Sequence, residues 1–343
     1  MRKFNVAVVG ATGAVGEELF RVMEEVDFPV GELLPLASAK SAGSEIEFKG
    51  RNYKVVELTE TVFDEHEIDI AFFSAGGSVS EKYAKFAAAS GAVVIDNTSH
   101  FRMDADVPLV VPECNPQDIA QWKNRGIIAN PNCSTIQMVQ ILKPLDDAYG
   151  INRVDVATYQ AASGAGKEGM EELVLQLQKF FEFKLDECEP KVFAHQLAFN
   201  VIPHIDVFLD NDYTKEEMKM VNETQKILHK SMEVSATCVR VPVLRSHSEA
   251  ITIKFKKDFE ISRVREILRN APSIVLVDDP SKNEYPMPLL SSDTNETYVG
   301  RLRRDNFDDK ILHLWCSADQ IRVGAATNAV RIALRWIDMQ QDK

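Results

Sequence analysis

The stretch VAVVGATGAVGEELF, residues 6–20, places three glycines between an apolar run and an amphipathic segment. The run FNVAVV (4–9) predicts a buried strand, and the apolar positions after the glycines recur at helical spacing. Gly10, Gly13 and Gly16 would therefore form a tight strand-to-helix turn whose backbone N–H groups can approach a pyrophosphate. The spacing is G-x-x-G-x-x-G rather than G-x-G-x-x-G, so its position directly after a strand is what indicates dinucleotide binding.

Outward from this turn, short apolar runs alternate with helical patterns up to about residue 130, which predicts a doubly wound parallel sheet. Beyond Cys133 the strands become longer and several of them alternate, with helices between them, so the simplest arrangement is a second domain of mixed sheet with helices on one face. The fold class is thus α/β, a Rossmann-type N-terminal domain followed by an α+β domain. The apolar helix at 325–339 could close back on the first domain, and the residues alone leave this open. Further strands are expected at 69–74, 92–96, 126–129, 154–162, 237–243 and 249–256, and helices at 80–90, 167–182, 214–230 and 261–270.

Length and charge limit the classes of function. A chain of 343 residues with 45% hydrophobic content can bury more than one core, so two domains are expected. With 52 acidic against 39 basic residues the formal net charge is -13, which makes nucleic acid and an anionic membrane poor partners. No apolar run approaches the roughly 18 residues of a membrane span.

The cysteines indicate a reducing, cytoplasmic setting. They are five in number, widely spread and free of any C-x-x-C pair, which argues against a disulfide framework and against a zinc or other metal site. The N-terminus runs from two basic residues directly into the first strand, without a signal-peptide pattern. The five residues are Cys114, Cys133, Cys188, Cys238 and Cys316.

The end of the second strand bears on cofactor choice. A site that prefers NAD usually carries an acid there to bind the ribose hydroxyls. The segment LLPLASAKSAG (33–43) has none, and its Ser38, Lys40 and Ser41 could instead receive a 2′-phosphate. We therefore expect NADP as the cofactor.

The segment IIANPNCSTIQMV (127–139) places Cys133 between a proline turn and the start of a helix. The amides and the positive dipole end of a helix N-terminus favour a thiolate, the form of cysteine that attacks carbonyl groups. The other four cysteines fit small core or strand-associated positions better. A thiol near a nicotinamide suggests covalent capture of an aldehyde or acyl group with hydride transfer. Among seven histidines, His247 is the best candidate acid/base, since it lies between two predicted strands beside Arg240 and Arg245.

Taken together, the motifs resemble those of the aspartate-β-semialdehyde dehydrogenase family, in that family's order from about residue 4 to residue 335. They are GATGAVG, SAKSAG, DNTSHFR, PNCSTIQ, YQAASGAG, EEMKM, RVPVLRSHSE and GAATNAV. The resemblance implies an NADP-binding domain over 1–132 completed by a C-terminal helix within 320–343, and a catalytic and dimerisation domain over 133–319. It also implies a homodimer and the NADPH-dependent reduction of L-aspartyl-4-phosphate to the semialdehyde and phosphate, a step of lysine, threonine, methionine and diaminopimelate biosynthesis.

The resemblance also implies roles for individual residues. Cys133 is matched to the nucleophile, His247 to the acid/base and Gln160 to the group that orients the acyl chain. Arg240 would bind the substrate α-carboxylate in a bidentate pair, Glu216 the α-amino group, and Arg102 with Lys219 the phosphate. The positions matched to the cofactor are Gly10, Thr12, Gly13, Ala14, Val15, Ser41, Ala42, Ser163, Gly164 and Asn328.

One of these assignments conflicts with local periodicity. Glu216, Lys219, Glu223 and Lys226 follow one another at spacings of three and four, which by itself predicts an ion-paired, solvated helix face. Two other functions remain as alternatives: an N-acetyl-glutamyl-phosphate reductase, with similar fold and chemistry, and a non-catalytic NADP-binding paralogue. A non-catalytic protein would have no reason to keep Cys133 and His247 together with Gln160 and Arg240.

Overall fold

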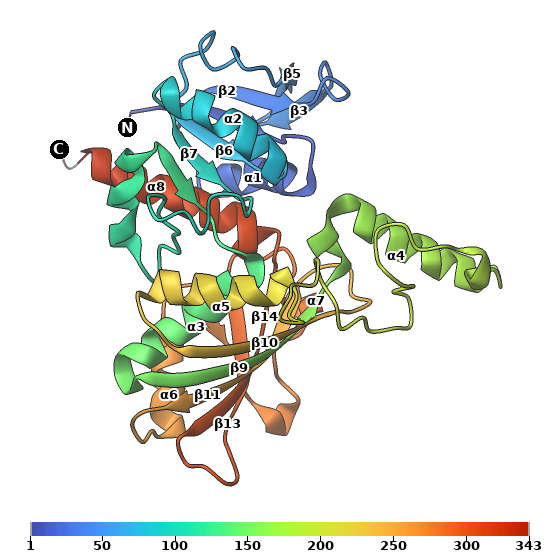
Figure 1. Ribbon diagram of the computed structural model, residues 1–343, viewed down its shortest axis with the longest axis vertical. Coiled ribbons are helices and arrows are strands. Elements are labelled where there is room, and N and C mark those ends of the chain that lie inside the picture. Colours follow the sequence, from blue (N-terminus) through green and yellow to red (C-terminus); the bar gives the residue numbers. More distant parts are fainter. Residues whose placement is uncertain (1, 342–343) are drawn as a thin grey trace. The chain divides into compact units, whose positions relative to one another are not determined.

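The computed structural model describes residues 2–341 and divides into two compact units. Unit 1 contains the chain up to Asn132 together with the segment from Ala325 onward, and unit 2 is Cys133–Gly324. Each unit has its own sheet and its own core (Figure 1).

Unit 1 is built on a six-stranded sheet in the order β5-β2-β1-β6-β7-β8, and every pairing in it is parallel. This is the Rossmann order, which reverses direction between β1 and β6 and places a ligand crevice beyond the carboxyl ends of those strands. The predicted α/β class and the Rossmann-type sheet are confirmed. The strands are β1 (Phe4–Val9), β2 (Val30–Ala37), β5 (Val56–Glu57), β6 (Ile70–Phe73), β7 (Val93–Asp96) and β8 (Ile127–Ala129), and a hairpin adds β3 (Glu45–Phe48) and β4 (Arg51–Lys54).

The helices of unit 1 include one from the far end of the chain. α1 (Ala14–Glu25) follows the glycine turn, and α8 (Thr327–Gln341) is entered through a π-helical turn, Arg322–Ala326. Side chains of α8 belong to the same core cluster as Phe4 and Leu19, and the Trp336 ring meets Phe4 edge to face with centroids 6.1 Å apart. The C-terminal helix thus completes the core of unit 1. The remaining helices are α2 (Gly77–Ala89) and the 3-10 helix η1 (Pro116–Asn124).

Unit 2 is a mixed sheet in the order β10-β9-β11-β14-β13-β12. Parallel pairing joins β9 to β10 and β12 to β13, and the other pairings are antiparallel. Apolar residues of α3 (Cys133–Tyr149), α5 (Lys215–Leu228) and α6 (Ile261–Asn270) form one core cluster with the strands. The strands are β9 (Ile151–Gln160), β10 (Glu233–Arg240), β11 (His247–Phe255), β12 (Ile274–Leu276), β13 (Thr297–Arg304) and β14 (Ile311–Ala318).

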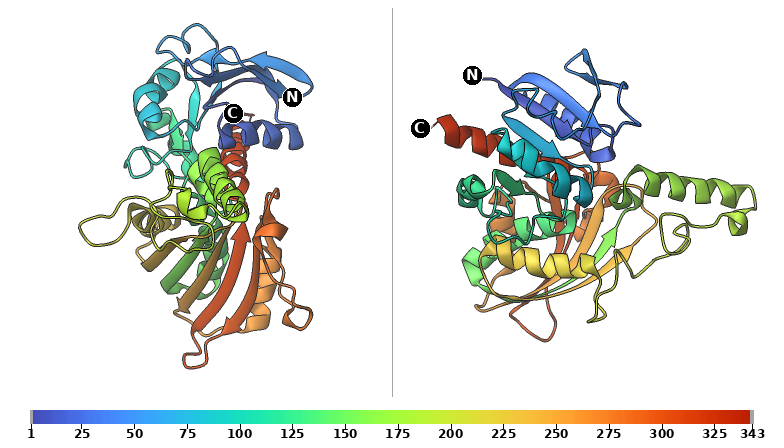
Figure 2. Two further views of the ribbon diagram at one scale, coloured as in Figure 1. Left: turned by 90° about the vertical axis from the view of Figure 1, so that its right-hand side faces the viewer. Right: turned by 45° about the horizontal axis from the view of Figure 1, so that its top comes forward.

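One arm of unit 2 departs from the sheet. After the 3-10 turn η2 (Ala162–Ala165), α4 (Gly166–Phe181) extends away from the strands (Figure 1 and the right-hand view of Figure 2). Large apolar side chains of the arm are exposed, among them Phe181 at 76% and Phe183 at 95%. The short elements that remain are η3 (Leu185–Glu187), η4 (Pro280–Lys282) and α7 (Pro288–Ser291).

Candidate active site

Cys133 is the first residue of α3, as the sequence predicts. Its side chain is half-buried, and a helix N-terminus supplies amides without intrahelical acceptors and the positive end of the dipole. The backbone of Gly324 lies so close that a Cβ added there would be 2.4 Å from the Cys133 Cβ. The thiol is therefore held between a helix terminus and a loop that tolerates only glycine.

His247 is completely buried and begins β11, so it lies at the start of a strand rather than in the predicted loop between two strands. The Ala161 N–H donates to His247 Nδ1 at 3.0 Å. Because Nδ1 accepts, the neutral ring carries its proton on Nε2, and no described residue hydrogen-bonds to Nε2. Burial, assisted by the charge of Arg240, holds the pKa of His247 well below its ordinary value. The ring is thus neutral and presents an unsatisfied Nε2–H.

Arg240 ends β10 beside the histidine. Its Nη1 donates to the Ala161 carbonyl at 2.6 Å, and burial lowers its pKa although the charges of Glu216 and Cys133 act in the opposite direction. A Cβ added to Gly164 would lie 2.7 Å from Arg240 Nη1 and 3.1 Å from His247 Nε2. Arg240 and His247 therefore converge on one glycine, and a larger residue would displace their side chains.

A polar chain connects the end of β9 to α5. Gln160 Nε2 donates to Glu216 Oε1 at 3.2 Å, and Lys219 Nζ lies 3.0 Å from Glu216 Oε2 and 2.8 Å from Asp206 Oδ2. Gln160 ends β9 in parallel register with Arg240, so the strand pairing itself places the amide beside the guanidinium. Lys219 keeps a raised pKa: burial alone would lower it, but Glu216 and Asp206 together outweigh that effect.

The solvated face expected from periodicity is wrong. Glu216 is 5% exposed and Glu223 is 1% exposed, because this face of α5 turns inward rather than toward water.

Arg245 does not join the cluster as the sequence suggests. It pairs with Asp319 at 2.7 Å and with Asp293 at 2.9 Å. Two residues that the sequence did not single out lie at the cluster instead: Asp206, which pairs with Lys219, and Gln320, which accepts from the Ser246 N–H at 2.9 Å and donates to Ser163 Oγ. Asp206 and Gln320 lie in irregular segments without periodicity, so no local signal identifies them.

The glycine turn of unit 1 has the geometry that a phosphate requires. Gly10 has a φ of +87°, and a Cβ there would be 2.8 Å from the Ser74 carbonyl oxygen. A Cβ at Gly16 would be 2.2 Å from the Gly10 carbonyl oxygen, so the helix can start this close to the turn only with glycine. Gly13 is the N-cap of α1. Thr12, Gly13, Ala14 and Val15 are half-buried at this N-terminus, where a pyrophosphate can reach their backbone.

The loop after β2 lies beside this turn. Thr12 Oγ1 is 3.5 Å from Ser41 Oγ, and the amides of Ser41 and Ala42 both donate to the Ser38 carbonyl. Lys40 is exposed, and Ser41 and Ala42 are half-buried. The loop thus offers hydroxyls and one cation next to the pyrophosphate turn.

Two other predicted residues of unit 1 are buried and anchored. Arg102 donates from Nε to the Asn130 carbonyl at 2.9 Å and from Nη2 to the Asn97 carbonyl at 2.8 Å. Asn328, near the start of α8, donates to the Val110 carbonyl at 3.0 Å and to Asn130 Oδ1 at 2.7 Å. Within the described chain no donor reaches Asn328 Oδ1, so this buried acceptor is available to a ligand amide. Ser163 and Gly164, which the resemblance also matched to the cofactor, belong to unit 2.

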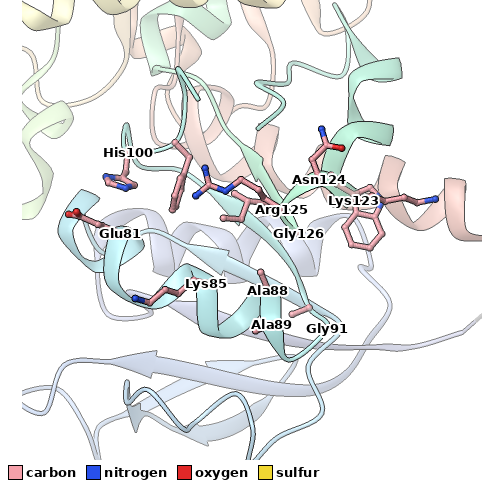
Figure 3. Close-up of a pocket in the computed structure, with 14 residues that line it drawn as sticks. Glu81, Lys85, Ala88, Ala89, Gly91, His100, Lys123, Asn124, Arg125 and Gly126 are labelled. Atoms are coloured by element: carbon pink, nitrogen blue, oxygen red, sulfur yellow. The ribbon is translucent and has the colours of Figure 1, made fainter. Parts of the chain in front are cut away.

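An open cavity of about 680 Å³ in unit 1 lies elsewhere (Figure 3). It is lined by α2, η1 and the start of β8, and none of the residues predicted above lines it. Its cations do not converge: Arg125 pairs with Asp104 at 2.6 Å, and Lys85 and Lys123 point in opposite directions (Figure 3). Cavity size alone therefore does not identify the site.

Residues 2–341 contain neither a metal-binding cluster nor a membrane-spanning helix. The His, Cys, Asp and Glu side chains of that range include no group of three or more arranged to hold a metal ion. Of the helices described there, none is both long and apolar enough to cross a membrane.

Comparison with known proteins agrees with this arrangement. The family model "Semialdehyde dehydrogenase, NAD binding domain" matches residues 5–122, and "Semialdehyde dehydrogenase, dimerisation domain" matches residues 142–323. A protein of Campylobacter jejuni named aspartate-semialdehyde dehydrogenase is 73% identical over 339 residues, 99% of both chains. One of the same name from Helicobacter pylori is 54% identical over 347 residues, covering 98% of this chain and 99% of that one.

A solved structure is equally close in fold. It is described as aspartate semialdehyde dehydrogenase II complexed with ASA from Vibrio cholerae, and it superimposes with a TM-score of 0.95 at 47% identity, covering 98% of this chain and 99% of that one. Fold and site together define an oxidoreductase of the semialdehyde dehydrogenase class. The chain belongs to the aspartate-semialdehyde dehydrogenase family.

Proposed function

We propose that this chain catalyses the NADPH-dependent reductive dephosphorylation of L-aspartyl-4-phosphate to L-aspartate-4-semialdehyde and phosphate, through a thioester on Cys133. The observation that carries the proposal is the convergence of His247 and Arg240 on Gly164, with the charge of Cys133 acting on Arg240. In this proposal Cys133 is the nucleophile, His247 the ring donor and Arg240 the cation that binds a carboxylate. All three belong to unit 2, which also holds the hydrogen-bonded pair Gln160 and Glu216.

The substrate's three polar ends find matched partners. Arg240 offers a planar fork to the α-carboxylate, and burial strengthens the pair. Glu216, already bonded by Gln160 and Lys219, offers a carboxylate to the α-ammonium. Lys219 remains cationic and would bind the departing phosphate, and Arg102 of unit 1 is proposed as the second phosphate ligand.

The proton steps follow from the histidine's hydrogen bonds. Cys133 attacks the acyl carbon as a thiolate, and the C–O bond to phosphate breaks as the thioester forms. His247 is the proposed acid/base, and its resting state is a donor at Nε2, because Ala161 occupies Nδ1. This Nε2–H can stabilise the oxyanion of both tetrahedral species. Nε2 can take the Cys133 proton only when the ring carries its own proton on Nδ1. The ring must therefore first lose the hydrogen bond that Nδ1 accepts from the Ala161 N–H.

The cofactor residues of unit 1 fit a dinucleotide. Gly10 and Gly16 form a cradle that any Cβ would fill, and Asn328 Oδ1 is an unpaired buried acceptor suited to a carboxamide N–H. When bound, NADPH supplies the hydride that reduces the thioester. The acid-free loop with Ser38, Lys40 and Ser41 supports NADP over NAD, so affinity for NADP should exceed that for NAD at least about tenfold, as for one charge-assisted contact. Equal dissociation constants in a fluorescence titration would reject the NADP preference.

We further infer a homodimer, because unit 2 matches a dimerisation-domain model and exposes much apolar surface. The rings of Tyr159 and Trp315 meet at a tilt of 47° with centroids 5.2 Å apart on the sheet face opposite α3, and the α4 arm carries exposed phenylalanines. Light scattering at micromolar concentration should give twice the chain mass, and a monomer would reject this inference.

The experiment that tests the activity follows absorbance of reduced nicotinamide after mixing the protein with L-aspartate-4-semialdehyde, NADP and phosphate. A parallel reaction uses N-acetyl-glutamate semialdehyde. An N-acetylated substrate lacks the α-ammonium that Glu216 would pair with, so this charge-assisted contact cannot form. Phosphate-dependent reduction of NADP is expected with L-aspartate-4-semialdehyde only. Reduction of NADP with N-acetyl-glutamate semialdehyde would assign the chain to the reductase alternative. No reduction of NADP with either substrate would support the non-catalytic paralogue.

A further inference from the structure

Directly behind the proposed catalytic residues lies a buried carboxyl group that the reaction described above does not use. Glu249 is 0% exposed and lies two residues after His247 on β11, so both side chains are on one face of the sheet. Its antiparallel partner on β14 is Cys316, which is also completely buried.

Helix α3 has a matching periodicity on the facing side. Cys133, Gln137 and Ile141 follow at intervals of four and lie on one helix face. Ile141 packs in the same core cluster as Ile251, and Gln137 Nε2 lies 3.9 Å from the Sγ of Cys316. Gln137 of α3 and Glu249 of β11 therefore meet at Cys316, and this middle level lies one turn after Cys133 on the helix and two residues after His247 on the strand.

The middle level is polar in an otherwise apolar core. The Cys316 thiol donates toward Glu249 Oε2 at 3.8 Å, and in the described chain neither Glu249 Oε1 nor Gln137 Oε1 has a hydrogen-bond partner. A proton on the carboxyl would let it donate as well as accept, so it could satisfy a buried acceptor that a carboxylate cannot. Burial raises the pKa of Glu249 well above its ordinary value, against the opposing hydrogen bonds from Gln137 and Cys316.

A carboxylate at this place would also disturb the chemistry. A negative charge one level behind Cys133 would disfavour the thiolate that the reaction needs. An uncharged carboxyl can instead connect strand to helix at no electrostatic cost to the nucleophile.

We propose that Glu249 is a positioning residue: in its protonated form it links β11 to α3 through Gln137, and so fixes His247 against Cys133. It acts through these two residues and does not touch substrate. The inference rests on the proposed function where it is tested by kcat. The rate of Cys133 alkylation tests it without depending on that function.

The test compares Glu249→Gln, Glu249→Ala and Gln137→Ala in the full chain, with Ile251→Ala as the matched control one level further from the site. The isosteric, uncharged Glu249→Gln should keep kcat within about threefold. Glu249→Ala and Gln137→Ala should each lower kcat at least about tenfold with little change in KM for NADP, because a small misplacement of reacting groups has large effects on rate. Ile251→Ala should lose stability but keep kcat.

The second readout is the rate of Cys133 alkylation by iodoacetamide as a function of pH. Glu249→Ala and Gln137→Ala should shift the midpoint, whereas Glu249→Gln and Ile251→Ala should leave it in place. Full kcat and an unshifted midpoint in Glu249→Ala would overturn the proposal. If Glu249→Ala does not fold, Gln137→Ala decides by the same criteria. Loss of activity in Glu249→Gln would show that an ionised carboxylate is needed instead. A wild-type chain without turnover would reject the proposed function alone, and the alkylation profiles would still decide this inference.

Discussion

Replacement of Glu249 by glutamine should stabilise the chain increasingly as the pH rises. The side chain is fully buried, and burial holds its folded-state pKa well above the 4.5 of an exposed glutamate. Above pH 4.5 the unfolded chain releases this proton while the folded chain keeps it. The folded state then binds more protons, so the stability of the wild type falls as pH rises toward the folded pKa. Glutamine has no proton to release and escapes this loss.

The magnitude follows from linkage, at about 1.4 kcal/mol for each pH unit and each proton. For each pH unit above 4.5 and below the folded-state pKa of Glu249, the difference in unfolding free energy between Glu249→Gln and the wild type should grow by about 1.4 kcal/mol in favour of the variant. The difference should become constant below about pH 4, where both states of the wild type are protonated. The pH-independent part of this difference in unfolding free energy reflects the exchange of the carboxyl OH for NH₂. Only its change with pH tests whether Glu249 is protonated in the folded chain.

The assay is urea unfolding of both proteins at equal concentration, because association with a second chain would make the midpoint concentration-dependent. Far-UV circular dichroism reports the transition, and the m-values should agree between the two proteins. A difference that does not change with pH would mean that Glu249 is already ionised in the folded protein, and it would refute the reasoning from burial.

Four other substitutions test the site. Cys133→Ala should abolish turnover while leaving the dissociation constant of NADP unchanged, and retained turnover would exclude the thioester route. Gly164→Ala places a Cβ 2.7 Å from Arg240 Nη1, so kcat/KM should fall on the order of 100-fold. A kinetically normal variant would mean that the side chains of Arg240 and His247 do not converge on Gly164 in solution. Lys219→Ala removes one charge-assisted contact to phosphate, so KM for phosphate should rise about 10- to 100-fold. A change confined to KM for the semialdehyde would mean that Lys219 binds the amino-acid end of the substrate instead. His247→Gln keeps an N–H donor, so its kcat should exceed that of His247→Ala about tenfold, and equal rates would mean that the imidazole must exchange a proton.

The first sheet was predictable because its strands are buried on both faces. Such strands appear in the sequence as uninterrupted apolar runs, and the run at 4–9 coincides with β1 (Phe4–Val9), while that at 69–74 contains β6 (Ile70–Phe73). The strands β13 and β14 were missed. β13 (Thr297–Arg304) has exposed or half-buried arginines at alternate positions in its second half, and such a pattern is hard to distinguish from a polar loop without its neighbours.

Site residues were predictable where backbone geometry determines the residue type. Gly10 is required by its positive φ, and Gly16 by the close approach of the Gly10 carbonyl oxygen. Cys133 is the first residue of a helix whose start is predicted by the preceding proline turn. Asp206 and Gln320 could not be found in this way, because their partners Lys219 and Ser163 lie 13 and 157 residues away in the chain.

The helix α5 shows what periodicity cannot distinguish. Glu216 and Lys219 have the same spacing whether they face water or the interior, since the pattern specifies only that they share a face. Burying such a pair has an electrostatic cost that solvated pairs avoid, and the cost is tolerated where each group has further partners. Here Gln160 and Asp206 provide them, at 3.2 and 2.8 Å. Periodicity therefore shows that charged residues share a helix face, and partners far away in the chain decide whether that face can be buried.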